Sequence, residues 1–122
     1  MAHNNHVIDR INKDINPFYG DPKEYYLELA KDWEDPYGTP DVRTHDTVRV
    51  VRDDSLVGSK VRGGDCLISS LPDHIDTIVY VQPRTGLAGV SILDVAKRHD
   101  KEVMLFMPSS KRISDHQACC IE

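Results

Sequence analysis

The 122-residue sequence predicts an α/β fold: a parallel sheet with crossover helices, in the order β-α-β-α-β-α. Residues 77–81 and 103–107 form two almost continuously apolar runs, which is typical of strands buried on both faces of a parallel sheet. Residues 86–99 between them place apolar side chains at helical spacing. Residues 47–52 are β-branched and lead into a helical pattern over residues 60–71. Alternating strands and helices of this kind predict right-handed crossovers.

The first 46 residues predict a loop-rich helical arm in front of this domain, which spans residues 47–122. Prolines and glycines recur through the arm and punctuate irregular structure. One amphipathic helix is expected at about residues 22–34, because Asp21 is a good N-cap and Pro22 suits the first helical position. Its apolar stripe consists of Tyr26, Leu29, Ala30 and Trp33. A second, shorter helix is expected over residues 7–15.

The last helix is expected to begin with a capping box at Ser114 and Gln117. Its pattern continues to Glu122 without a glycine or lysine stop signal. We therefore expect that a further strand follows, and that the chain is the N-terminal part of a longer enzyme or a truncated relative of one.

Composition argues against several classes of protein. With 15 basic and 20 acidic residues, the net charge is −5, so a basic face for nucleic acid is not expected. No apolar run reaches the roughly 18 residues of a membrane span, and no signal peptide is evident. The three cysteines and six histidines lack metal-ligand spacing. We expect reduced thiols, no metal site, no nucleic-acid or membrane partner, and a cytoplasmic location.

Two segments carry candidate chemistry. Lys60 follows a Gly-Ser turn at a strand-to-helix junction, where a lysine can react with a carbonyl group; the alternative is a solvated lysine in the first turn of a helix. The loop from Gln82 to Gly89 leads into a helix N-terminus, where free N–H groups favour a carboxylate or phosphate. The alternative interpretation of this loop is the start of a capped helix, in which the glycines allow tight packing. In open parallel sheets, both segments are expected at the carboxyl edge of the strands.

Both segments resemble the fold type II pyridoxal-phosphate enzymes. This tryptophan synthase β-like group includes cysteine synthase, threonine dehydratase and aminocyclopropane-carboxylate deaminase. The run Arg52-Asp53-Asp54-Ser55-Leu56-Val57-Gly58-Ser59-Lys60-Val61-Arg62 looks like the segment that bears the family's Schiff-base lysine. Arg84-Thr85-Gly86-Leu87-Ala88-Gly89 occupies the place of the family's Thr/Ser-Ser-Gly-Asn-x-Gly loop. The resemblance covers roughly residues 47–122.

The resemblance implies a role for each matched residue. Lys60 would be the catalytic lysine, and Lys60, Ser59 and Arg62 would contact pyridoxal 5'-phosphate. The substrate, a small amino acid, would be held by its carboxylate at Thr85, Gly86, Leu87, Ala88 and Gly89. The reaction would be elimination, deamination or β-replacement. Relatives are commonly dimers, so we expect a homodimer or a site that needs a missing C-terminal half.

Leu87 departs from the family pattern, because it stands where the family has an asparagine that contacts the cofactor ring. This departure favours a first alternative, a catalytically silent relative that serves as a binding or assembly module. A second alternative is an unrelated α/β domain that binds a phosphate-bearing ligand, with Lys60 as a phosphate contact.

Overall fold

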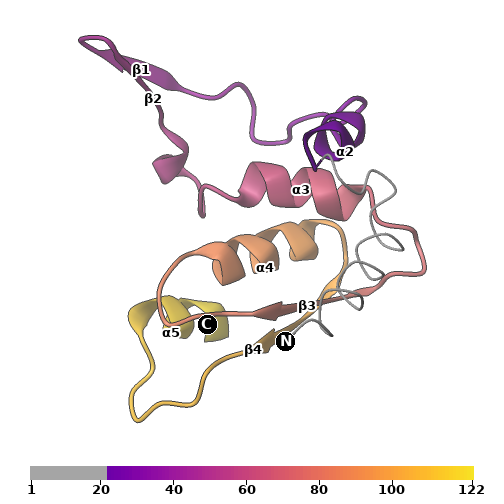
Figure 1. Ribbon diagram of the computed structural model, residues 1–122. Helices are drawn as coiled ribbons and strands as arrows, with labels where there is room; N and C mark the ends of the chain where they lie inside the picture. The colour runs from indigo at the N-terminus through magenta and orange to yellow at the C-terminus, as the bar shows by residue number, and fades with distance from the viewer. Residues whose placement is uncertain (1–21) are drawn as a thin grey trace, which may run out of the picture. The chain divides into compact units, whose positions relative to one another are not determined.

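The computed structural model describes residues 22–122, which belong to two compact units, residues 1–33 and 34–122 (Figure 1). In the first unit, helix α2 spans Pro22–Leu29, so the expected helix is present but ends earlier than predicted. The expected N-cap, Asp21, and the expected helix over residues 7–15 lie outside the described residues.

The second unit begins with a β-hairpin. Strand β1 (Val42–His45) pairs antiparallel with β2 (Val48–Val51), and the connecting turn places Asp46 at a φ of 52°. The prediction that residues 47–52 form the first strand of the parallel sheet was therefore wrong. A two-residue turn favours pairing with the preceding strand, and every residue of both strands is exposed. The hairpin spans the domain boundary expected after residue 46.

The parallel sheet consists of β3 (Thr77–Val81) and β4 (Glu102–Phe106), joined through helix α4 (Ala88–Arg98). This β-α-β unit confirms the predicted parallel sheet and crossover. The expected burial of both strand faces was wrong, because side chains alternate between half-buried and exposed along each strand. On the outer face, four apolar side chains are between 52% and 62% exposed: Val79, Val81, Met104 and Phe106. Helix α4 packs on the other face only.

Helix α3 (Val61–Ser69) packs on α4, so that α4 lies between α3 and the two strands (Figure 1). The core of this packing is formed by Val61, Ile68 and Val95, all less than 9% exposed. Each such side chain contributes roughly 1.5–3 kcal/mol by burial. A short 3-10 helix, Asp53–Ser55, connects the hairpin to the turn before α3.

The predicted capping box is present at the start of helix α5 (Asp115–Ile121). The Gln117 N–H donates to Ser114 Oγ over 3.2 Å, and the Ser114 N–H donates to Gln117 Oε1 over 3.1 Å. Both bonds satisfy donors that a helix start leaves open. Helix α5 contacts α4 and completes the described chain.

Candidate functional site at the carboxyl edge of the sheet

Lys60 is the N-cap residue of α3 and is exposed. Its backbone is nevertheless well anchored. Its carbonyl accepts a hydrogen bond from the Gly64 N–H over 2.8 Å, and the next residue, Val61, is fully buried in the core. The position of the Lys60 backbone is therefore fixed by packing, while its amine stays accessible to a reactant.

The Gly58-Ser59-Lys60 turn lies directly against the N-terminus of α4. A Cβ on Gly58 would be 2.3 Å from Ser91 Oγ and 3.3 Å from Leu87 Cβ, so only glycine permits this approach. Ser91 Oγ in turn donates to the Leu87 carbonyl over 2.8 Å. The structure thus brings together the two segments that the sequence singled out. They lie at the N-termini of two adjacent helices, α3 and α4.

Gln82 shapes the loop between β3 and α4. Its fully buried side chain accepts a hydrogen bond from the Gly89 N–H (2.8 Å) and donates to the carbonyls of Pro83 (3.0 Å) and Gly86 (3.1 Å). A Cβ on Gly89 would lie 2.3 Å from Gln82 Oε1, so this glycine is required by the clamp itself. The role of Gln82 was not predicted from the sequence, where its only signal is a polar residue directly after a strand.

The N-terminus of α4 is open to an anion only in part, because the Gly89 N–H, expected to hold a carboxylate, already donates to Gln82 Oε1. Leu87 is the N-cap residue and supplies no side-chain hydrogen bond, and the first turn contains no acidic residue. The helix dipole therefore meets no negative charge from the helix itself. Thr85 and Gly86 are exposed beside this end, whereas Ala88 and Gly89 are buried in the first turn. Gly86 adopts a φ of 102°, and a Cβ there would meet no atom within 4 Å.

Arg84 joins the loops that follow β3 and β4. Its guanidinium donates to Ser110 Oγ over 2.8 Å and to the Arg112 carbonyl over 3.0 Å. Four exposed cationic side chains extend from these loops and from the neighbouring turn: Lys60, Arg84, Lys111 and Arg112. Among residues 22–122, none of the four forms an ion pair with a carboxylate. This edge is therefore suited to a negatively charged ligand.

Arg62 has a different environment from the one the resemblance implies. Its guanidinium donates to the Asp53 carboxylate over 3.1 Å, to Asp35, and to the Gly38 carbonyl over 2.7 Å. Burial opposes the charged form, but the hydrogen bonds to Asp35 and Asp53 outweigh it and raise the pKa of Arg62. Its charge is thus balanced by two carboxylates, and it ties residues 35–38 to α3. Ser59, in contrast, is exposed next to Lys60.

A groove of about 650 Å³ lies elsewhere, along α4 and α5, and of the residues near the Lys60 turn only Val57 lines it. Within the described chain, no three potential ligand side chains gather in a way that could hold a metal ion. None of the helices between residues 22 and 122 has the length and apolar character that crossing a bilayer requires.

Comparison with known proteins found no relative. No protein-family model, no curated protein and no solved structure matches this chain.

Proposed function

We propose that this chain is the N-terminal part of a pyridoxal-phosphate-dependent enzyme of the tryptophan synthase β-like kind, acting on a small amino acid by elimination, deamination or β-replacement. One observation carries the proposal. Close packing of Gly58 on Leu87 and Ser91 holds the Lys60 turn beside the N-terminus of α4. This contact supports the proposal that Lys60 and the start of α4 serve one ligand.

The described residues fit part of a pyridoxal-phosphate site. The accessible amine of Lys60 suits covalent attachment, and the open space at Gly86 suits a ligand next to the loop. Leu87, 46% exposed, offers an apolar surface but no hydrogen bond to the cofactor ring. The remaining ring and phosphate contacts would come from a C-terminal half or from a second chain, as in a homodimer. When bound, the cofactor supplies an electron sink for negative charge at the substrate's α-carbon.

The chain's own residues would bind the substrate and move a proton. The substrate carboxylate would dock beside the N-terminus of α4, where the exposed Thr85 hydroxyl can donate, whereas the Gly89 N–H is already bonded to Gln82 Oε1. Lys60 would hold the cofactor, and its amine would carry a proton to or from the substrate's α-carbon. The cations Arg84 and Arg112 favour approach of the anionic substrate. We also propose that the enzyme is cytoplasmic, which agrees with a small amino acid as substrate and a phosphorylated cofactor.

Labelling with pyridoxal phosphate tests the proposal. The protein is incubated with the cofactor, reduced with borohydride, and digested for mass spectrometry. We expect the modification on Lys60. We also expect the absorbance band of the covalently bound cofactor to be absent from Lys60→Arg, because arginine keeps the positive charge but cannot form the covalent bond. Lys111→Ala removes another exposed cation from the same edge and serves as the matched control. Labelling that persists in Lys60→Arg, or that moves freely among surface lysines, would contradict the proposal.

A second candidate is a binding domain for a phosphate-bearing ligand. The apolar N-cap Leu87 favours it, as do the four exposed cations, which form no ion pair with a carboxylate among residues 22–122. In that case, inorganic phosphate would compete with pyridoxal phosphate, and Lys60→Arg would bind as tightly as the wild type. A catalytically silent relative would be labelled on Lys60 and turn over no amino acid.

A further inference from the structure

A strap of four residues, 35–38, is bound to the first turn of α3. The guanidinium of Arg62, in that turn, donates to the Asp35 carboxylate and, over 2.7 Å, to the Gly38 carbonyl. Asp35 also accepts a hydrogen bond from the Tyr37 N–H over 2.9 Å. In the part of the chain that the structure describes, no backbone–backbone hydrogen bond joins the strap to another segment. Side-chain contacts therefore hold the strap in place.

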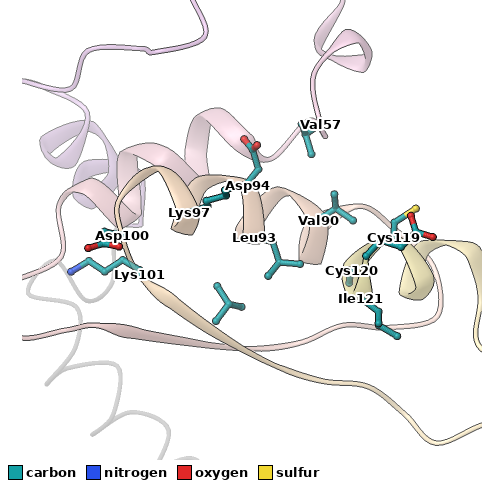
Figure 2. A pocket seen from close by; sticks show the side chains of 12 residues that line it. Val57, Val90, Leu93, Asp94, Lys97, Asp100, Lys101, Cys119, Cys120 and Ile121 are labelled. Carbon is teal, nitrogen blue, oxygen red and sulfur yellow. The ribbon is translucent and has the colours of Figure 1, made fainter.

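Tyr37 is the second anchor of the strap, at α4. Its ring packs against the core between α3 and α4, and its hydroxyl donates to Asp94 over 3.2 Å. Asp94 projects from α4 on the side away from the strands (Figure 2). The guanidinium carbon of Arg98 lies 4.6 Å from the centroid of the Tyr37 ring, which is a cation–π contact. Detachment of the strap would therefore break no hydrogen bond of a helix or a sheet.

The bound strap masks a cation two residues from Lys60. Arg62 lies between the carboxylates of Asp35 and Asp53, and these three side chains are between 16% and 24% exposed. One guanidinium between two carboxylates leaves an excess of negative charge, which repels an anion. The closed strap therefore opposes binding of an anion at the Lys60 turn.

Release of the strap would free one edge of the Arg62 guanidinium. Its Nε donates to both carboxylate oxygens of Asp53 over 3.1 Å, and its Nη1 donates only to the strap. Its Nη2 forms no hydrogen bond with any described residue. Nη1 and Nη2 together are the fork that binds a phosphate in bidentate geometry. A phosphate monoester carries roughly 1.5–2 negative charges at neutral pH, so it is suited to displace the single charge of Asp35.

We propose that the strap is an autoinhibitory contact, in which Asp35 holds the place that the phosphate of a ligand takes at Arg62. The inference rests on the proposed function in one respect, a phosphate-bearing ligand at the Lys60 turn. Strap and phosphate exclude each other, so the apparent affinity for phosphate is reduced to the extent that the strap is closed. Pyridoxal phosphate and an unrelated phosphate-bearing ligand supply the same group.

Titration with inorganic phosphate tests the inference. Asp35→Asn removes the competing carboxylate and should tighten phosphate binding about two- to tenfold, as expected for a partly exposed charged pair. Asp54→Asn is the matched control, because it makes the same charge change at an exposed carboxylate that pairs with Arg52 instead. Equal tightening in both variants, no tightening in Asp35→Asn, or no phosphate binding at all would overturn the inference.

Tyr37→Phe tests the strap without a change of charge. It keeps the ring but removes the hydrogen bond to Asp94, so phosphate should bind about two- to fivefold more tightly. In the wild type, phosphate should speed hydrogen exchange of the Tyr37 and Gly38 N–H groups as the strap detaches. Unchanged affinity in Tyr37→Phe, or exchange that phosphate slows or leaves unchanged, would show that strap and phosphate do not compete.

Labelling of Lys60 separates this inference from the proposed function. Pyridoxal has the aldehyde of pyridoxal phosphate but lacks the phosphate. Asp35→Asn should therefore speed labelling by pyridoxal phosphate and leave labelling by pyridoxal unchanged. Lys60 labelling that Asp35→Asn does not alter would overturn the autoinhibitory strap and leave the proposed enzyme standing. Tighter phosphate binding by Asp35→Asn without any labelling of Lys60 would support the strap, assign it to an unrelated phosphate-bearing ligand, and overturn the proposed enzyme.

Discussion

Replacing Gly58 with alanine should destabilise the second unit by forcing the Lys60 turn away from α4. The new Cβ would lie 2.3 Å from Ser91 Oγ, far inside normal contact distance. Overpacking of this kind costs about 1–3 kcal/mol. Reduced freedom of the unfolded chain offsets about 0.4–1 kcal/mol of that loss. We expect a net loss of roughly 0–2.6 kcal/mol in the free energy of unfolding, which in a domain of this size lowers Tm by about 4 °C per kcal/mol.

Urea unfolding at neutral pH measures this loss, and Gly63→Ala is the matched control. Gly63 lies in α3, and a Cβ there would meet no atom within 4 Å. Removing a glycine from a helix should stabilise the protein by about 1 kcal/mol. Opposite signs for the two glycine variants are therefore expected. If Gly58→Ala proved as stable as Gly63→Ala, the packing argument for the Lys60 turn would be wrong.

A double-mutant cycle with Ser91→Ala identifies the source of the loss. Ser91→Ala alone should cost about 0.5–1.5 kcal/mol, because it removes the hydrogen bond to the Leu87 carbonyl. In that background, Gly58→Ala no longer meets the hydroxyl, although Leu87 remains close. We expect a coupling energy of about 1 kcal/mol, as is typical of residues in contact. Strict additivity would refute a direct clash between these positions.

Two further predictions concern buried polar groups. His99→Ala should lower the free energy of unfolding by about 1–3 kcal/mol, because the Asp65 carboxylate, 3% exposed, loses a 2.7 Å contact with His99 Nε2. Urea titration measures this loss, and His99→Gln should lose less stability than His99→Ala. Equal losses in the two variants would contradict this explanation. Iodoacetamide at neutral pH should modify exposed Cys119 first, because burial raises the pKa of Cys66 and Cys120 and keeps these thiols protonated until higher pH. Faster modification of Cys66, measured by peptide mass, would contradict that order.

Elements specified by neighbouring residues were predictable from the sequence. The capping box of α5 depends on Ser114 and Gln117 alone, and β3 has the bounds that its apolar run predicted. The pairing of residues 47–52 was not predictable in the same way. Their β-branched composition indicates a strand but does not specify its partner. The turn at Asp46 decided in favour of the hairpin.

The burial of the strand residues also could not be predicted from the local sequence pattern. Val79 and Met104 are as apolar as residues buried on both faces of a sheet, yet they lie on its exposed face. The number of layers around a sheet depends on which other segments pack on its faces. An apolar run in the sequence does not indicate which segments those are. Among the described residues, this face stays exposed and no strand pairs with the outer edge of β4.

Part of the candidate site was predictable, because Lys60 and the loop from Thr85 to Gly89 carry recognisable residue types. Their supports were not. Gln82 acts through bonds to Pro83, Gly86 and Gly89, which depend on the course of the folded loop. Arg62 was expected to contact a cofactor, but it donates to Asp35, 27 positions earlier in the chain. Such contacts depend on tertiary structure and leave no periodic signal.

The three loops of the carboxyl edge are held by three different devices, namely the Gly58 contact, the Gln82 clamp and the Arg84 bridge. The Gly58 contact holds the Lys60 turn, and the other two hold the loops after β3 and β4, while the Lys60 side chain stays exposed. A catalytic lysine works as a neutral amine, which desolvation promotes. The described residues provide positioning but little desolvation, so a cofactor or partner must cover the amine for the proposed chemistry.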